Sequence, residues 1–171
     1  MDVALLVLRV VVGLLLIGHG TQKLFGWFGG PGREGFAGGL RKMGFRPPGA
    51  WSLGAGLAEA GGGLLLALGL LNPLGSLGII ASMLVATFTV HWGKGLFVTT
   101  GGPELTITNI AVATAVAIAG PGRFALDSWF GISLPEPATG LVFAVLMLLG
   151  VGAAFATRRT EPAEVSNTSP A

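Results

Sequence analysis

The chain has 171 residues, of which 51% are apolar and only 11% are charged. This charged fraction is less than half of that in soluble domains, so residence in a membrane is expected. The absence of cysteine excludes disulfides, thiolate metal sites and an intrinsic dithiol relay, so any redox role needs a borrowed electron carrier. The formal net charge of +2 comes from basic residues that mostly flank apolar runs, a pattern that disfavours nucleic-acid binding and indicates membrane topology.

Five apolar segments approach the length of about 20 residues that crosses a bilayer as a helix. They are residues 3–27, 50–71, 74–92, 104–120 and 137–157. Asn72 and Pro73 separate the second segment from the third, which predicts a tight antiparallel hairpin. Segment 3–27 has neither a basic leader nor a small-residue cleavage motif, so it is expected to be a retained span. The predicted fold is all-α and transmembrane.

Lysine and arginine are distributed unevenly over the connections, which predicts the orientation. With five spans, one side of the membrane receives Arg33, Arg41, Lys42, Arg46, Lys94, Arg158 and Arg159. The other side receives only Arg123. This predicts a multi-pass membrane protein with its N-terminus outside and its C-terminus in the cytoplasm. The polar tail 158–171 is expected to be disordered.

The first loop admits two interpretations. Phe36, Leu40 and Met43 recur at helical spacing within residues 33–46, while the basic residues lie mostly off that stripe. A short interfacial helix on an anionic membrane leaflet would have this pattern. An ordinary basic loop is the alternative, because the loop also contains three glycines.

A possible internal repeat appears when the chain is shifted by 72 residues. Residues 19–31 then align with residues 91–103, with six identities in thirteen positions, and the two histidines of the chain fall in register. A repeat of this kind predicts a four-helix bundle built from two helix pairs, followed by a fifth C-terminal span. Convergence is the alternative, because histidine, lysine and aromatic residues are common at membrane interfaces.

Four ionisable residues fall inside the predicted spans, namely Arg9, His19, Lys23 and Glu59. Each charge costs roughly 2.5–3.5 kcal/mol to insert, so such residues normally face protein or a water-filled cavity. On helix 1, His19 lies about 80° and Lys23 about 40° from Arg9, which places all three on one stripe. Counting residues along both helices puts Glu59 between the levels of Arg9 and His19. One interpretation is a structural Arg9–Glu59 ion pair, and the other is a ligand or proton site.

The second half of the chain adds polar residues toward the predicted cytoplasmic side. Glu104 follows Pro103 and suits the start of a helix. Asn109 lies about one turn deeper, where an amide bonds across helices or contacts a ligand. His91 occupies the position that matches His19 in the repeat. No metal site is expected, because the sequence has no Glu-x-x-His pair and only one histidine in each motif.

The run from Gly18 to Gly26, which reads GHGTQKLFG, closes a first span that carries Arg9 and resembles the DoxX family of bacterial membrane proteins. The segment from Gly49 to Glu59 and the pair Thr108-Asn109 extend this resemblance over about residues 1–125. The resemblance implies a four-helix transmembrane core at 1–125, and the chain departs from it by an additional segment at 126–157. It also implies kinship with the membrane subunit of thiosulfate:quinone oxidoreductase, although this chain has no cysteine to carry a sulfur intermediate.

Two functional hypotheses follow. In the first, the protein is the membrane subunit of a redox system, possessing a bundle site for quinone or a similar lipophilic carrier and docking a soluble redox enzyme on its basic cytoplasmic loops. His19 and Glu59 would then exchange protons, and the ligand-binding residues would be Arg9, Lys23, His91 and Asn109. In the second, the protein is a non-catalytic scaffold or a carrier of small solutes, and the buried charges only hold the helices together.

Overall fold

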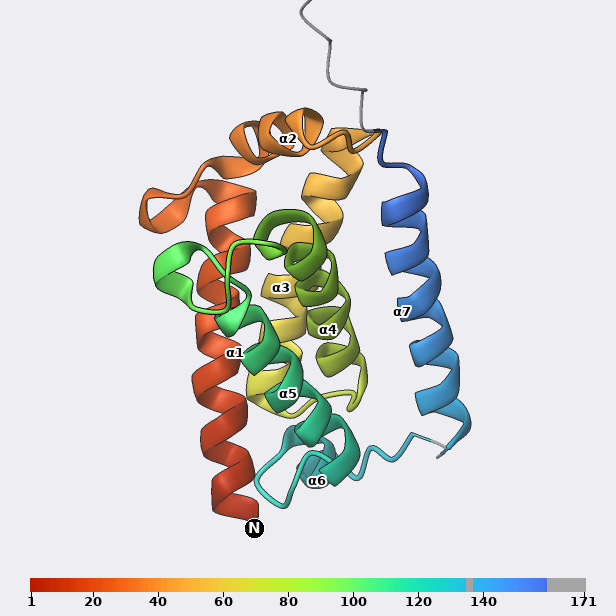
Figure 1. Cartoon of the computed structure of the whole chain (residues 1–171). Coiled ribbons are helices and arrows are strands. Elements are labelled where there is room, and N and C mark those ends of the chain that lie inside the picture. The colour runs from red at the N-terminus through yellow and green to blue at the C-terminus, as the bar shows by residue number, and fades with distance from the viewer. Residues whose placement is uncertain (135–136, 160–171) are drawn as a thin grey trace, which may run out of the picture.

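The computed structural model describes residues 1–134 and 137–159, and the regular elements in these ranges are helices (Figure 1). The longer ones are α1 (Asp2–Phe25), α2 (Gly32–Lys42), α3 (Pro48–Leu68), α4 (Leu74–Ala86), α5 (Glu104–Ala119) and α7 (Ala138–Ala156). The shorter ones are the 3-10 turns η1 (Trp27–Gly29) and η3 (Val98–Thr100), the π-helical segment η2 (Thr87–His91), and α6 (Leu126–Phe130). The predicted all-α class is confirmed, and residues 160–171 of the predicted disordered tail lie outside the described ranges.

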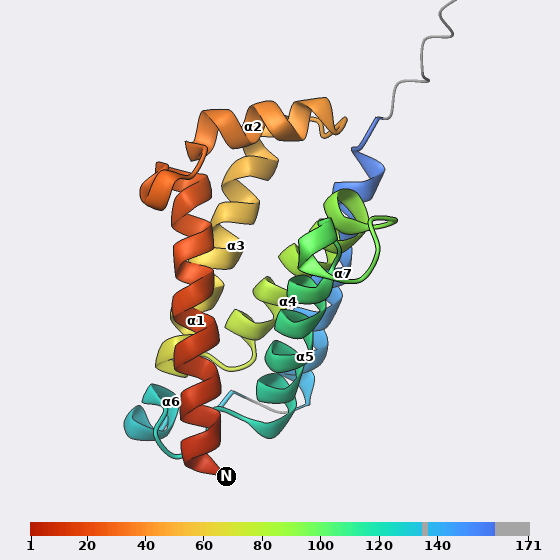
Figure 2. The same ribbon diagram turned by 60° about the vertical axis from the view of Figure 1, so that its left-hand side comes forward.

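Four helical stretches are long and apolar enough to cross a membrane: α1, α3, α4 continued through η2, and α7. They correspond to the predicted spans 3–27, 50–71, 74–92 and 137–157. The predicted span 104–120 forms α5, whose 16 residues are fewer than the roughly 20 that cross a bilayer. Figures 1 and 2 show that α5 covers only part of the length covered by α1. The architecture is that of a multi-pass helical membrane protein.

The helix backbones approach closely where two glycines face each other. A Cβ atom placed on Gly13 of α1 would lie 2.6 Å from the carbonyl oxygen of Gly63 in α3. A Cβ atom placed on Gly62 of α3 would likewise lie 2.9 Å from the carbonyl oxygen of Gly75 in α4. Glycine pairs of this kind bring transmembrane helices together by direct backbone contact, because lipid provides no hydrophobic drive between helices.

Both ends of α3 follow the helix signals in the sequence. Pro48 occupies the first turn of α3, and Gly69 ends the helix in the left-handed conformation with φ 63°. The chain then turns and begins α4 at Leu74, so the predicted hairpin is confirmed. The interfacial-helix interpretation of loop 33–46 is also supported, because α2 is a helix that lies across the ends of α1 and α3 in Figure 2.

The bundle has two sides that diverge toward the end that carries α2. Figure 2 shows α1 and α3 on one side and α4, α5 and α7 on the other. The two sides are joined by the α3–α4 hairpin, and α2 covers the α1–α3 side at the opposite end. The N-terminus and the C-terminal end of α7 lie at opposite ends of the molecule (Figure 1).

The two proposed repeat copies have different local structures. His19 lies inside α1, which continues to Phe25 and is followed by η1 and α2. His91 instead ends the π-helical segment η2, and an irregular connection with the short η3 leads to α5. The repeat therefore stays a prediction from sequence.

Candidate functional site

A cavity of about 550 Å³ lies between the two sides of the bundle, beneath α2. Its apolar walls come from α2, α3, α4 and α7, and they include Phe36, Leu40, Met43, Trp51, Ala58, Met83, Val85, Val151 and Ala154. Its polar lining includes Lys23, Glu59, Ser82, His91, Thr106 and Asn109. A concave, mostly apolar space of this volume with a few polar groups is typical of a small-molecule site.

A buried ion pair occupies one part of the cavity wall. Glu59 on α3 has 0% exposure, and its Oε1 atom pairs with the Nζ atom of Lys23 on α1. The hydroxyl of Ser82 on α4 donates a second hydrogen bond to the same oxygen, at 2.7 Å. The other carboxylate oxygen, Oε2, is buried and has no hydrogen-bond partner among the described residues. A buried oxygen that accepts no hydrogen bond is energetically costly.

Lys23 also connects this ion pair to α2. Its Nζ atom lies 5.1 Å from the ring centroid of Phe36, on the helix that covers the cavity. A cation over an aromatic face is attracted by the ring quadrupole. Lys23 therefore joins three helices, and its side chain is 23% exposed.

The predicted Arg9–Glu59 ion pair is wrong. The backbone of Gly20 on α1 contacts Ala60 on α3, so Glu59 lies at the level of the last turns of α1, where Lys23 is available. Arg9 is eleven residues before Gly20, about 16 Å away along the helix. The sequence estimate counted residues from the assumed helix ends, whereas the glycine contacts between α1 and α3 set the actual register.

A second polar group lies on the α4–α5 side of the cavity. The Nδ1 atom of His91 is 2.7 Å from the carbonyl oxygen of Gly101. The amide of Asn109 on α5 contacts the sulfur of Met83 at 3.8 Å, which is a weak partner for an amide. The hydroxyls of Thr87 and Thr106 bond to each other at 2.7 Å and fix η2 against α5. This side therefore presents an imidazole and an amide whose bonding capacity is only partly used.

His19 lines the same cavity, but its side chain belongs to the exposed class. The three residues of the predicted stripe on helix 1 therefore differ in burial: Arg9 is buried, Lys23 is partly exposed and His19 is exposed. Of the six predicted site residues, the structure brings five to one cavity: His19, Lys23, Glu59, His91 and Asn109. Arg9 lies elsewhere.

Hydrogen bonds join the C-terminal end of α7 to the residues that follow α2, next to the part of the cavity that α7 lines. The Arg158 side chain donates to the carbonyl oxygen of Met43 at 2.9 Å, and the Arg159 backbone donates to that of Gly44 at 2.9 Å. Beneath this contact, Leu40, Phe45 and Ala154 form a small buried cluster. Elsewhere α7 packs mainly on α4.

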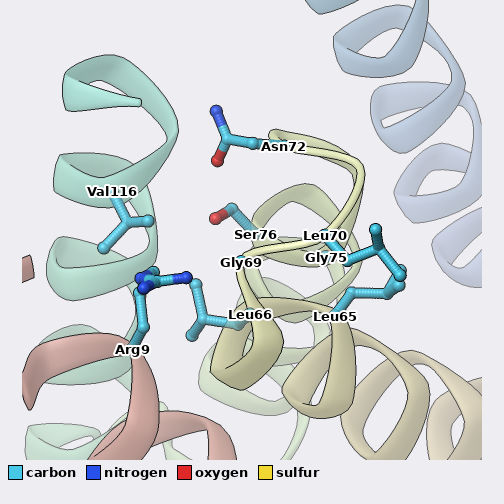
Figure 3. A pocket seen from close by; sticks show the side chains of 9 residues that line it. All are labelled: Arg9, Leu65, Leu66, Gly69, Leu70, Asn72, Gly75, Ser76 and Val116. Atoms are coloured by element: carbon cyan, nitrogen blue, oxygen red, sulfur yellow. The ribbon is translucent and has the colours of Figure 1, made fainter. Parts of the chain in front are cut away.

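Arg9 belongs to a separate polar cluster at the hairpin end of the bundle (Figure 3). Its exposure is 1%, and its Nη2 atom donates to the carbonyl oxygen of Phe124 at 3.2 Å. Asp127, which attracts the guanidinium electrostatically, accepts hydrogen bonds from the backbone N–H groups of Leu71 and Asn72 at 2.8 and 2.9 Å. The space beside Arg9 measures only about 10 Å³, which accommodates no more than a single water molecule.

Sequence reasoning missed Ser82 and Asp127. A single serine in an apolar span carries no pattern, and only the α3–α4 register shows that it faces Glu59. Asp127 follows a loop, so its role in holding the α3–α4 turn depends on a contact between distant segments. Among residues 1–134 and 137–159, no three His, Cys, Asp or Glu side chains gather in a way that would hold a metal ion.

The helices and the buried charged groups define an all-helical, multi-pass membrane protein with a cavity between the two sides of the bundle. The DoxX family profile matches residues 4–92, slightly more than half of the chain. The chain belongs to the DoxX family. No curated protein and no solved structure shows a significant match.

The family match covers one side of the cavity and part of the other. His19, Lys23, Glu59, Ser82 and His91 lie within residues 4–92. Asn109 on α5 and the whole of α7 lie beyond the matched range. The ion pair and both histidines thus belong to the family region, whereas the wall formed by α7 comes from the part of the chain outside it.

Proposed function

We propose that this protein is the membrane subunit of a redox system and binds a quinone or a similar lipophilic carrier in the cavity beneath α2. The observation that carries the proposal is the buried Glu59 carboxylate, which faces an apolar cavity of about 550 Å³ with one oxygen unpartnered among the described residues. A carrier ring with an alkyl tail would occupy such a space, while polar groups on the wall would orient its oxygens.

The residues around Glu59 suit proton exchange with a bound carrier. Lys23 and Ser82 both engage Oε1, so they hold the carboxylate in place, and Oε2 is the buried oxygen that has no partner among the described residues. Reduction of a quinone consumes two electrons and two protons. In this proposal Glu59 and His19 exchange the protons, and Lys23, His91 and Asn109 contact the ligand. Arg9 has a structural role at the other end of the bundle.

The electrons would come from a soluble redox enzyme, because the chain has no cysteine. The end of the molecule that carries α2 is basic, with exposed Arg33, Arg41, Lys42, Arg46 and Arg159. By the distribution of positive charge, we assign this end to the cytoplasm of a bacterium and the N-terminus to the outside, with α5 completing a fifth pass. A basic cytoplasmic surface attracts anionic lipid and an acidic protein partner alike.

The proposal is tested by titrating the detergent-purified protein with menadione, a soluble quinone, and recording the ultraviolet difference spectrum. Wild type is expected to bind saturably. Glu59→Gln, which keeps the shape but removes the charge, is expected to bind at least about tenfold more weakly, because hydrogen bonds to charged groups contribute roughly 1.5–3 kcal/mol. Glu34→Gln, on the exposed face of α2, is the control and should bind like wild type. Absence of saturable binding to a folded wild type would refute the proposal.

A further inference from the structure

The edge of the cavity between α3 and α7 faces the lipid side of the bundle. α4 lies between these two helices, and α7 packs mainly on α4 (Figure 1). Gly54 of α3 and Gly150 of α7 both line the cavity and both belong to the exposed class. A Cβ atom placed on either glycine would meet no other part of the described chain within 4 Å. Because α3 and α7 are both long and apolar enough to cross a membrane, this edge is continuous with the lipid-facing surface of the protein.

The walls of this edge consist of small and apolar side chains. Besides the two glycines, Ala55 and Ala58 line it on α3, and Val151 and Ala154 line it on α7. These six residues define the α3–α7 groove. An apolar space that stays empty loses dispersion contacts along its whole lining. A hydrocarbon chain from the surrounding bilayer therefore gains contacts when it enters the groove, and it brings no polar group that the walls would have to satisfy.

Arginines stand at the ends of both helices that form the groove. Arg46 lies just before α3, whereas Arg158 and Arg159 lie just after α7. An isolated antiparallel bridge between Phe45 and Arg158 holds these two segments side by side. Arg46 and Arg159 both belong to the exposed class. Guanidinium groups bind phosphate oxygens with paired hydrogen bonds, so the arginine end of the groove suits a phosphate group.

We propose that the α3–α7 groove binds an anionic phospholipid, with one acyl chain between Gly54 and Gly150 and the phosphate group at Arg46 and Arg159. The net negative charge of the headgroup is attracted by the basic residues at this end. The site does not depend on the proposed function, because a phospholipid can occupy the groove whether or not a carrier binds. Its α7 wall lies outside the family-matched residues 4–92, so the lipid site is a feature of this chain's additional span.

Tryptophan fluorescence reports on the groove, because Trp51 lines the cavity and packs against Phe45. The other three tryptophans are exposed, and Trp27→Phe, Trp92→Phe and Trp129→Phe leave Trp51 as the only one. This single-tryptophan protein is titrated in detergent with phosphatidylglycerol that carries bromine on its acyl chains, which quenches tryptophan on contact. Brominated phosphatidylcholine, which has no net charge, is titrated in parallel. We expect saturable quenching by both lipids and about tenfold tighter binding of phosphatidylglycerol, since each nearby arginine contributes to the attraction.

The position of the acyl chain is tested by filling the groove from α7. Gly150→Leu places a side chain in the groove. Gly152→Leu is the matched control, because Gly152 lies on the same helix in equally open surroundings but is not among the residues that line the cavity. Gly150→Leu should weaken the binding of both lipids at least about tenfold, and Gly152→Leu should bind like the single-tryptophan protein.

The position of the headgroup is tested by removing positive charge. Replacing Arg46 and Arg159 together by glutamine should abolish the preference for phosphatidylglycerol over phosphatidylcholine. The control replaces Arg33 and Lys94, two exposed basic residues on other segments, by glutamine, and it should retain most of the preference.

Two results would overturn the proposal. One is quenching of Trp51 that is the same in Gly150→Leu and in the single-tryptophan protein, because the chain would then lie outside the groove. The other is a full preference for phosphatidylglycerol in the double arginine variant. Thermal unfolding is compared first, and Gly54→Leu, which fills the groove from α3, replaces Gly150→Leu if that variant does not fold. Menadione binding is measured separately, so failure of the quinone site and failure of the lipid site are distinguished.

Discussion

The two ends of this bundle both bury charged side chains, but they surround them with very different amounts of space. At the hairpin end, Arg9 and Asp127 are hydrogen-bonded to backbone groups of Phe124 and of the α3–α4 turn, Nε and Nη1 of Arg9 have no partner among the described residues, and the void beside them measures about 10 Å³. At the end beneath α2, the Lys23–Glu59 pair borders a cavity of about 550 Å³ and leaves one carboxylate oxygen unpartnered within the described part of the chain.

This difference shows that burial of a charged side chain does not by itself distinguish a structural role from a ligand-binding role. Arg9 and Glu59 are equally buried, with exposures of 1% and 0%. What separates them is the neighbourhood: the Arg9 cluster joins α1 to the α3–α4 turn and to the α6 region, whereas Glu59 faces a space that protein atoms do not fill. We interpret the first arrangement as a stabilising contact, and the second borders the cavity in which we propose that a ligand binds.

The largest effect is expected when the hairpin end is altered. Arg9→Met keeps most of the side-chain volume but removes a positive charge near Asp127 and leaves the Phe124 carbonyl without its donor. Leaving a buried acceptor without its partner costs about 1–3 kcal/mol and more where a charged group is involved, so the midpoint of thermal unfolding in detergent should fall. Arg123→Met, which replaces an exposed arginine at the same end, should change it little. A fully stable Arg9→Met that had lost quinone binding would reverse our assignment of the two ends.

A smaller effect, confined to binding, is expected when the cavity is filled. Gly54 lines the cavity, and a Cβ atom placed on it would meet nothing within 4 Å. Gly54→Leu should therefore weaken menadione binding at least about tenfold by occupying ligand space, while stability stays the same or rises because leucine favours a helix more than glycine by up to about 1 kcal/mol.

The matched control is Gly18→Leu, another helical glycine with open space around it that does not line the cavity. It should gain the same helix propensity and bind menadione normally. Equal binding by both leucine variants would place the ligand outside the cavity beneath α2.

The smallest effect is expected from Ser82→Ala. This change removes one donor to Glu59 and leaves the ion pair with Lys23. Titration should show menadione binding weakened by about threefold to tenfold, the range for one hydrogen bond of roughly 0.5–1.5 kcal/mol. Ser76→Ala serves as the comparison, because the Ser76 hydroxyl is buried without a described partner beside the Arg9 void, and it should bind like wild type.

The fold was largely predictable, because membrane spans and turns depend on residues that are close together in the sequence. Apolar length predicted five segments, four of which are long helices, the Asn72–Pro73 turn predicted the hairpin, and the stripe from Phe36 to Met43 favoured α2 as one of two interpretations. The predicted segment 104–120 coincides with α5, Glu104–Ala119, but its 16 residues are fewer than the roughly 20 that cross a bilayer.

Five of the six predicted residues line the cavity and Arg9 does not, and the pairings between the charged residues were not predicted. The free-energy cost of burying a charge in a span drew attention to Arg9, Lys23 and Glu59. The partner of each residue, however, depends on the register between helices. That register is set by glycine contacts such as Gly13 with Gly63, which a single sequence does not reveal. The contributions of Ser82 and of α7 to the cavity depend on the same kind of long-range packing.

The central claim is that a lipophilic carrier occupies the cavity beneath α2, and photolabelling tests it most directly. A photoreactive azidoquinone would be bound to the purified protein, activated by light, and located by mass spectrometry of the peptides. We predict labels on the α3 and α7 segments around Ala58 and Val151, suppressed by excess menadione and lost in Gly54→Leu. Labels spread over the outer faces of the helices, or insensitive to menadione, would contradict the account.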